Sequence, residues 1–260
     1  MKFTPEQAYQ AVHRIEIDLV EFCDMHCHQC TRVVTEAPSK RMIRPDKVAK
    51  FICESTELKY QWQRIHIIGG EPTLHPRFLD ICGMLSFYKQ TRNPSCIIEL
   101  RTNGGPGYQK IKNQLPDGIQ VSDDRGFKAN GDDPRHHDHH VAPSDHGVDT
   151  SGLYCPCVFD CGLGLGPYGY LPCHLGSGLI RVFGIDCAVQ RLKDCTPEWW
   201  NRTLTQFCDK CGFLLVENKR ADLVGCTPWN MDPARGKISP SWERALSQYD
   251  LSATDHLVKD

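Results

Sequence analysis

Fifteen cysteines stand in this chain of 260 residues, and the most closely spaced of them form two groups. In the first group, Cys23, Cys27 and Cys30 follow the spacing C-x3-C-x2-C. Three thiolates on one loop can ligate three irons of a four-iron cluster and leave the fourth iron open to a ligand from outside the protein. The loop is therefore predicted to hold a reactive iron-sulfur cluster. The alternative is a zinc site with His26 or His28 as the fourth ligand.

A second motif, Gly69-Gly70-Glu71-Pro72, closes a later apolar segment. With both motifs, the chain resembles the radical S-adenosylmethionine (SAM) superfamily, which binds the ammonium group of SAM at the second one. The resemblance implies that SAM completes the coordination of the open iron. It also implies that one electron from the cluster cleaves SAM to a 5′-deoxyadenosyl radical, which abstracts a hydrogen atom from the substrate. A zinc site would need no such second motif.

Two further positions come from the same resemblance. Asn103 and Ser122 follow later strands, where members of the superfamily supply polar contacts to the ribose of SAM. One position departs from the pattern, because Gln29 stands before the third cysteine, where an aromatic residue is usual. The packing of the adenine is therefore expected to differ.

The elements that would position these residues alternate as strand and helix. Hydrophobic alternation predicts strands at 15–19, 64–68, 96–100 and 119–121, and helices at 45–52, 79–88, 108–115 and 242–249. This order predicts an α/β fold with a parallel sheet, whose chemistry lies at the C-terminal ends of the strands. The resemblance implies a partial (β/α)6 radical SAM barrel over 1–150. The polar stretch 125–150 is expected to be a loop with at most one short strand, near Val141.

The second group of cysteines lies in the C-terminal half. Cys155 stands eighteen positions before Cys173, and Cys208 and Cys211 form C-x2-C. The pattern is similar to Twitch, a shortened SPASM module in which four cysteines enclose one auxiliary 4Fe-4S cluster. The resemblance implies two 4Fe-4S clusters, a Twitch-like module over 151–230 and a C-terminal tail with a short helix over 231–260. A closed cluster is expected to accept an electron from the substrate radical.

Alternatives remain open in this second group. Cys157 and Cys161 compete with Cys155, which is preferred because Cys-Pro followed by an apolar pair matches the module best. Cys208 and Cys211 alone would also fit a zinc knuckle. The remaining cysteines are predicted to be buried apolar thiols: Cys53, Cys82, Cys96, Cys187, Cys195 and Cys226. As an alternative, Cys187, Cys195 and Cys226 could ligate a further cluster.

Histidines crowd one loop of the polar stretch. A metal site is possible in such a tract, but a hydrated surface loop is the preferred interpretation, because loop side chains do not converge without support. The tract contains His136, His137, Asp138, His139 and His140.

Charge and compartment exclude several classes of partner. The chain has 30 basic and 32 acidic residues and a net charge of −2, so no cationic surface for nucleic acid is expected. No apolar stretch has the length of a signal sequence or membrane span. A cytoplasmic location is expected, where free thiols bind metal rather than form disulfides. The resemblance implies an external electron donor such as flavodoxin or ferredoxin, and a small-molecule or peptide substrate.

Three functions remain open. Among compact superfamily members, the architecture is most similar to the aminocyclitol dehydrogenases, which implies oxidation of a small carbohydrate-like substrate. Radical modification of a ribosomally made peptide by crosslinking, epimerisation or oxidation is the second possibility. A non-enzymatic iron-sulfur or zinc-binding protein is the third, and the Gly-Gly-Glu-Pro motif speaks against it. No catalytic acid or base can be named from the sequence.

Overall fold

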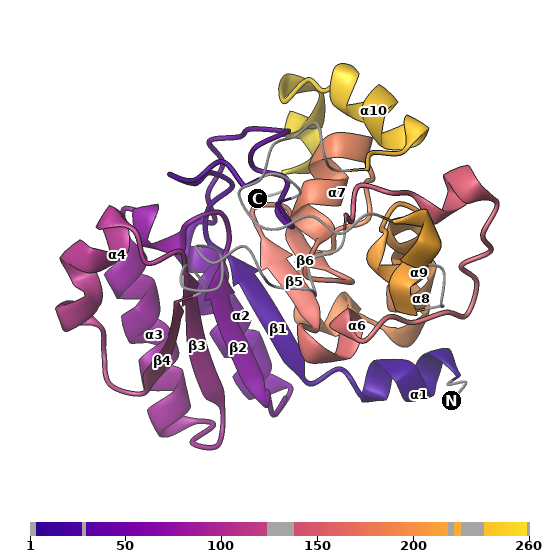
Figure 1. Cartoon of the computed structure of the whole chain (residues 1–260). Helices are drawn as coiled ribbons and strands as arrows, with labels where there is room; N and C mark the ends of the chain where they lie inside the picture. The colour runs from indigo at the N-terminus through magenta and orange to yellow at the C-terminus, as the bar shows by residue number, and fades with distance from the viewer. Residues whose placement is uncertain (1–3, 28–29, 124–137, 218–220, 225–236, 259–260) are drawn as a thin grey trace.

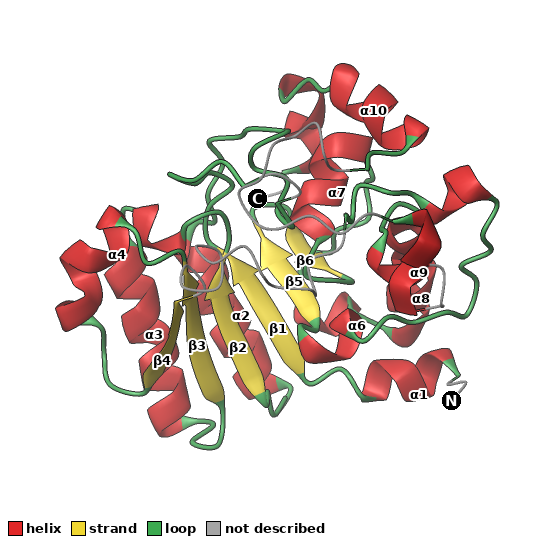
Figure 2. Cartoon of the chain, viewed as in Figure 1, coloured by secondary structure: helices red, strands yellow, loops and turns green. Residues whose placement is uncertain are grey.

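A six-stranded sheet runs through the computed structural model, which describes residues 4–27, 30–123, 138–217, 221–224 and 237–258. Its strand order is β4-β3-β2-β1-β5-β6 (Figures 1 and 2). All neighbouring strands are parallel except β6, which runs antiparallel to β5. The strands are β1 (Arg14–Asp18), β2 (Arg64–Ile68), β3 (Ile97–Thr102), β4 (Ile119–Asp123), β5 (Leu163–Gly166) and β6 (Gly169–Leu171).

The helices expected from the sequence form where alternation predicted them. In α2, Pro45 occupies the first turn, where its missing N–H is tolerated, and Val48 and Phe51 are buried one turn apart. Figure 2 shows α2 and α3 lying along one face of the sheet. The described helices are α1 (Pro5–Gln10), α2 (Pro45–Glu57), α3 (Phe78–Thr91), α4 (Pro106–Ile111), α6 (Cys157–Asp160), α7 (Gly176–Phe183), α8 (Pro197–Cys208), α9 (Phe213–Glu217) and α10 (Pro240–Ser247).

The two faces of the sheet differ in polarity. Ile15 and Ile17 of β1 are fully buried in the apolar core, and burial of each contributes about 1.5–3 kcal/mol. The alternate residue Glu16 is paired in register with His66 of β2, and His66 is paired with Glu99 of β3. All three are buried, so one face of the sheet carries a row of ionisable groups inside the protein.

The class predicted from the sequence, an α/β partial barrel with a mainly parallel sheet, is confirmed. However, β5 and β6 come from the segment assigned to the auxiliary module, and β5 pairs directly with β1. A strand beside β1 satisfies backbone groups that would otherwise form an open edge. Gly162 permits this approach, since it has φ +80° and a Cβ there would lie 1.8 Å from the carbonyl oxygen of Arg14. The domain boundaries remain a prediction.

Residues 138–142 form no strand, which agrees with the expected loop of at most one short strand, but they are buried. The expectation for Cys53 was wrong. Cys53 is exposed on α2, whereas Cys82, Cys96 and Cys195 are buried as predicted. Cys187 is half-buried, and Cys226 lies outside the described residues. In the described part of the chain, no helix has the length and apolar content that a membrane span requires.

Candidate functional site

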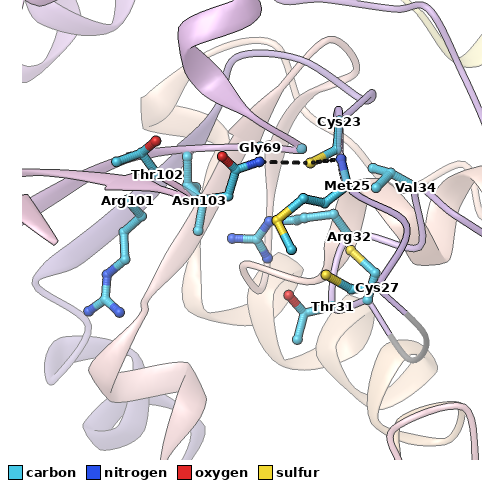
Figure 3. Close-up of a pocket in the computed structure, with 13 residues that line it drawn as sticks. Cys23, Met25, Cys27, Thr31, Arg32, Val34, Gly69, Arg101, Thr102 and Asn103 are labelled. Atoms are coloured by element: carbon cyan, nitrogen blue, oxygen red, sulfur yellow. Dashed lines mark hydrogen bonds between the residues drawn. The ribbon is translucent and has the colours of Figure 1, made fainter. Parts of the chain in front are cut away.

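The first cysteine group lies on the loop after β1 and opens onto a hollow (Figure 3). Cys23, Cys27 and Cys30 line it together with Gly69 and Gly70, the first residues after β2. The hollow measures about 620 Å³, counting space open to solvent. Burial raises the pKa of the Cys23 thiol to about 11. A thiolate here therefore needs a nearby cation such as a metal centre.

The two glycines are required by the close approach of the neighbouring backbone. Gly69 has φ +140°, and a Cβ there would lie 2.6 Å from the carbonyl oxygen of Val20. A Cβ on Gly70 would lie 1.9 Å from the carbonyl oxygen of Phe22. Backbone hydrogen bonds from Gly70 to Val20 (2.7 Å) and from Glu71 to Phe22 (2.9 Å) fasten the two loops. The motif thus packs the end of β2 directly against the start of the cysteine loop.

The Glu71 carboxylate binds other residues of the chain and does not face the hollow. It is fully buried and does not line the hollow. Its carboxylate accepts hydrogen bonds from the Thr73 hydroxyl (2.6 Å), the Thr102 hydroxyl (2.9 Å) and the Asn103 backbone N–H (2.7 Å). The side chain therefore joins the end of β2 to the end of β3. Pro72, also buried, begins the short 3-10 helix Pro72–Leu74.

Asn103 reaches the cysteine loop from the end of β3. Its side-chain nitrogen donates to Asp24 Oδ1 at 2.6 Å and lies 3.5 Å from Cys23 Sγ (Figure 3). A hydrogen bond to a ligating sulfur is one way in which a protein tunes an iron-sulfur cluster. Ser122 pairs with Arg101 across β3 and β4, and Arg101 lines the hollow whereas Ser122 does not. Ribose binding by Asn103 and Ser122 stays a prediction.

The second cysteine group surrounds a separate apolar cavity. Cys155, Cys173, Cys208 and Cys211 all line it, each less than 9% exposed, and Cys157 lines it as well. They come from the segment before α6, the turn after β6, and the end of α8 with the turn that follows. The other lining residues are apolar: Val158, Leu175, Leu179, Leu204, Phe207 and Leu214.

Cys161, the third candidate beside Cys155, lies elsewhere. Burial raises the pKa of its thiol, and the neighbouring carboxylate of Glu16 raises it further. Its sulfur and one ligand atom each of Glu16 and His174 lie within 4.8 Å of one another. A metal ion is disfavoured there, because the Glu16 carboxylate already binds Arg32 and accepts from or shares a proton with His66 at 3.0 Å. Any cation would face the guanidinium.

The electrostatics of the second cavity require a compensating charge. Burial raises the pKa of Cys173 to about 12, and burial together with the neighbouring cysteines raises the pKa of Cys208 and Cys211. Four thiols in an apolar enclosure stay protonated unless a metal centre takes the proton's place. The cavity and its donor set therefore fit a closed metal centre with four thiolate ligands.

Sequence reasoning missed a buried ionic network behind the cysteine loop. Arg32 binds Asp18 at 2.9 Å and Glu16, and donates to the His174 carbonyl at 2.8 Å. Burial would raise the pKa of Glu16, but Arg32, His174 and His66 together outweigh it and hold that pKa well below its usual range. Burial dominates at Asp18 and raises its pKa to about 6. The sequence signal that could have indicated this network is the alternation of Glu16 and Asp18 with isoleucines in β1.

The histidine tract also differs from its prediction. His139 is 2% exposed and His140 fully buried, so a hydrated surface loop was wrong for these two residues. Asp138 is fully buried as well. His136 and His137 lie outside the described residues. The tract was misjudged because its composition is polar, while its partners lie far away in the sequence.

A cysteine loop after the first strand and a Gly-Gly motif after the second lie on a partial α/β barrel, the arrangement expected from the resemblance to the radical SAM superfamily. No protein-family model matches the chain, and no curated protein matches it. Among solved structures, it is similar to BtrN in complex with AdoMet and 2-DOIA, with 14% identity over 88% of this chain and 97% of that chain and a TM-score of 0.45.

Two further structures show a weaker likeness. A selenomethionine form of BtrN in an open conformation has 17% identity over 78% of this chain and 87% of that chain, with a TM-score of 0.43. SuiB of Streptococcus suis, bound to its precursor peptide SuiA, has 18% identity over 42% of this chain and 23% of that chain, with a TM-score of 0.32. Likeness at this level concerns the overall arrangement and carries no conclusion about activity.

Proposed function

We propose that this chain is a radical SAM enzyme that oxidises a small, carbohydrate-like substrate. The observation that carries the proposal is the convergence of Cys23, Cys27 and Cys30 on one hollow beside the Gly-Gly motif. These three thiols would hold a 4Fe-4S cluster with one open iron. SAM bound there would supply a 5′-deoxyadenosyl radical able to take a hydrogen atom from the substrate.

The chain's own residues support this chemistry by holding the loop still. Glu71 fixes the ends of β2 and β3 beneath the hollow, and Asn103 donates toward the sulfur of Cys23. Arg32, neutralised by Glu16 and Asp18, forms part of the inner wall of the hollow. Such preorganised groups keep the reacting partners in place and reduce the access of water.

The second site is proposed to hold the auxiliary 4Fe-4S cluster on Cys155, Cys173, Cys208 and Cys211. Zinc with four thiolates would hold the sulfurs about 3.8 Å apart, given a Zn–S distance of about 2.3 Å. Within the described residues, no three of these sulfurs lie within 4.8 Å of one another. A cubane, whose irons lie at separate corners, suits the wider spacing. The cluster would accept the electron that the substrate radical loses.

The substrate class rests on the polar face of the sheet. Glu16, His66 and Glu99 form a polar row across three strands. Arg101 extends from this row to the hollow, with its Nε 3.1 Å from Glu99. A hydroxylated small molecule suits such surroundings better than an apolar one. An external donor such as flavodoxin or ferredoxin would reduce the first cluster. The cytoplasm would supply this donor and the substrate.

Anaerobic reconstitution tests the proposal. With SAM and a reductant, the protein should form 5′-deoxyadenosine, whereas Cys27→Ala should form none. Cys53→Ala is the matched control, because Cys53 is exposed on α2. Zinc in place of iron at either site, or no 5′-deoxyadenosine from the fully loaded protein, would refute the proposal. Deuterium transfer from labelled sugars or from peptides into 5′-deoxyadenosine would then separate a carbohydrate from a peptide substrate.

A further inference from the structure

A buried segment, residues 138–142, lies between the two cysteine sites and has no part in the function proposed above. Its side chains at Asp138, His139 and His140 are each at most 2% exposed. Buried polar groups are costly unless they are hydrogen-bonded. The contacts of the segment therefore indicate what it does.

On one side, the segment touches the first cysteine loop. The Nε2 atom of His139 lies 3.1 Å from the carbonyl oxygen of Cys30. A carbonyl only accepts, so Nε2 carries the proton and donates to this oxygen. The imidazole is held flat against Phe213, with ring centroids 5.6 Å apart and planes 4° apart, and His140 meets it edge-on at 4.4 Å. The donor therefore points at Cys30 from a fixed ring.

On the other side, the same residue touches the auxiliary pair. The backbone N–H of Gly212, directly after Cys211, donates to the His139 carbonyl at 3.0 Å. The two segments are in close contact: a Cβ added at Gly212 would lie 2.5 Å from the carbonyl oxygen of Asp138. Only His139 and two hydrogen bonds thus separate the backbone at Cys30 from the backbone next to Cys211.

The rest of the segment anchors this connection. His140 stacks on Trp242 with centroids 4.2 Å apart, and Trp242 Nε1 donates to the carbonyl of Lys210, between the two auxiliary cysteines, at 2.6 Å. Asp138 accepts from the backbone N–H of Lys237 at 2.8 Å. The segment is therefore tied to the auxiliary C-x2-C turn and to α10 at once, which leaves His139 little freedom to move.

We propose that His139 is a positioning residue that couples the two cysteine sites, holding Cys30 in register with the Cys208–Cys211 turn. The proposal rests on the function proposed above, because it concerns the setting of the two clusters. A displacement of the auxiliary turn is transmitted through Gly212 and His139 to Cys30, and so changes the coordination of the first cluster and its affinity for SAM. A histidine that merely filled space would transmit nothing.

Two substitutions separate the hydrogen bond from the ring. His139→Phe keeps an aromatic ring against Phe213 but removes the donor, and His139→Gln keeps a donor but removes the ring. The exposed His146→Gln is the control. His139→Phe should weaken SAM binding to the reduced protein by about fivefold or more, which is the lower range of measured coupling between sites. The variant should still bind the iron of two clusters. His139→Gln should recover at least half of the lost affinity.

A double-mutant cycle supplies a readout that a structural role alone would not give. Gly212→Ala pushes on the segment from the auxiliary side, and it should change the electron paramagnetic resonance signal of the first cluster. In the His139→Phe background, the same substitution should leave that signal unaltered, since the connection is already broken. Equal effects of Gly212→Ala in both backgrounds, or a loss of SAM affinity below fivefold in His139→Phe, would overturn the proposal.

The spectra also separate this proposal from the proposed function. They are recorded on the reduced, iron-loaded protein before any turnover. A wild-type protein that shows the coupled signals but forms no 5′-deoxyadenosine would refute the enzyme and leave the role of His139 intact. Active protein without coupling would do the reverse.

Discussion

Arg181 of α7 offers the sharpest test of how the first cysteine loop is held. Its guanidinium is buried, with 1% of the residue exposed, and lies 2.8 Å from Glu21 Oε1. It also donates to the carbonyl oxygens of Ala37 (2.8 Å), Arg32 (2.7 Å) and Val33 (3.2 Å), all on the loop that carries the cysteines. A helix from the C-terminal half therefore fixes a loop from the N-terminal half.

Replacement of Arg181 by Met should be severe. Methionine fills much of the same space but leaves Glu21 without its guanidinium partner and takes one donor away from each of the three carbonyls. Removal of one partner of a buried ion pair costs about 3–5 kcal/mol. For a domain of this size that corresponds to a fall in melting temperature of roughly 6–20 °C.

The assay is anaerobic thermal and urea unfolding of the iron-loaded protein, followed by circular dichroism. Arg191→Met is the control, because Arg191 is an exposed arginine that pairs with Asp194 on the surface, and little change is expected. The double variant Arg181→Met, Glu21→Gln should recover part of the loss, since no charge is left unpaired. A single variant within about 1 kcal/mol of the wild type would refute the reasoning.

Further predictions concern the two sites and the ionic network. Gly70→Ala should lower SAM affinity by about tenfold or more, because its Cβ would collide with the cysteine loop, whereas Gly83→Ala, with open space around it, should be neutral or stabilising by about 1 kcal/mol. Cys173→Ala should halve the iron content, while Cys161→Ala should leave it unchanged. Asp18 has a pKa of about 6, above its unfolded value, so its contribution to stability should fall as pH rises from about 4 to about 6.

These predictions are checked by binding, iron analysis and unfolding. For Asp18, the comparison is with Asp18→Asn, which stays neutral; the wild type should lose stability relative to the variant as pH rises through this window. A parallel pH dependence of the two proteins would contradict the assignment. Iron loss in Cys161→Ala would show that this cysteine, rather than Cys155, belongs to the second site. Unchanged SAM affinity in Gly70→Ala would mean that the loops do not need their close contact.

Several elements followed from local pattern. The strand predicted at 64–68 has the same bounds as β2, and α2 begins at the predicted Pro45. Alternation and helix-start signals are encoded within a few neighbouring residues, so no distant contact was needed. The two cysteine groups were recognisable for the same reason, because ligand spacing on a loop is a local property.

Residues outside those patterns depended on distant partners. The polar composition around His139 predicted exposure, yet Cys30 and Phe213, far away in the chain, bury it. Likewise, Cys155, Cys157 and Cys161 are near neighbours in sequence, but only the first two line the auxiliary cavity. The single turn of α6 between them directs Cys161 toward Glu16 instead.

The sequence by itself determined the alternating α/β elements, the two sets of thiols and the glycines that bring one loop against the other. Only the tertiary structure decided that β5 joins the sheet beside β1, that Arg181 and Arg32 hold the cysteine loop, and that His139 connects the two sites. The physical reason is that hydrophobic periodicity and ligand spacing act over a few residues, whereas burial and ion pairing are set by whichever segments the completed fold brings together.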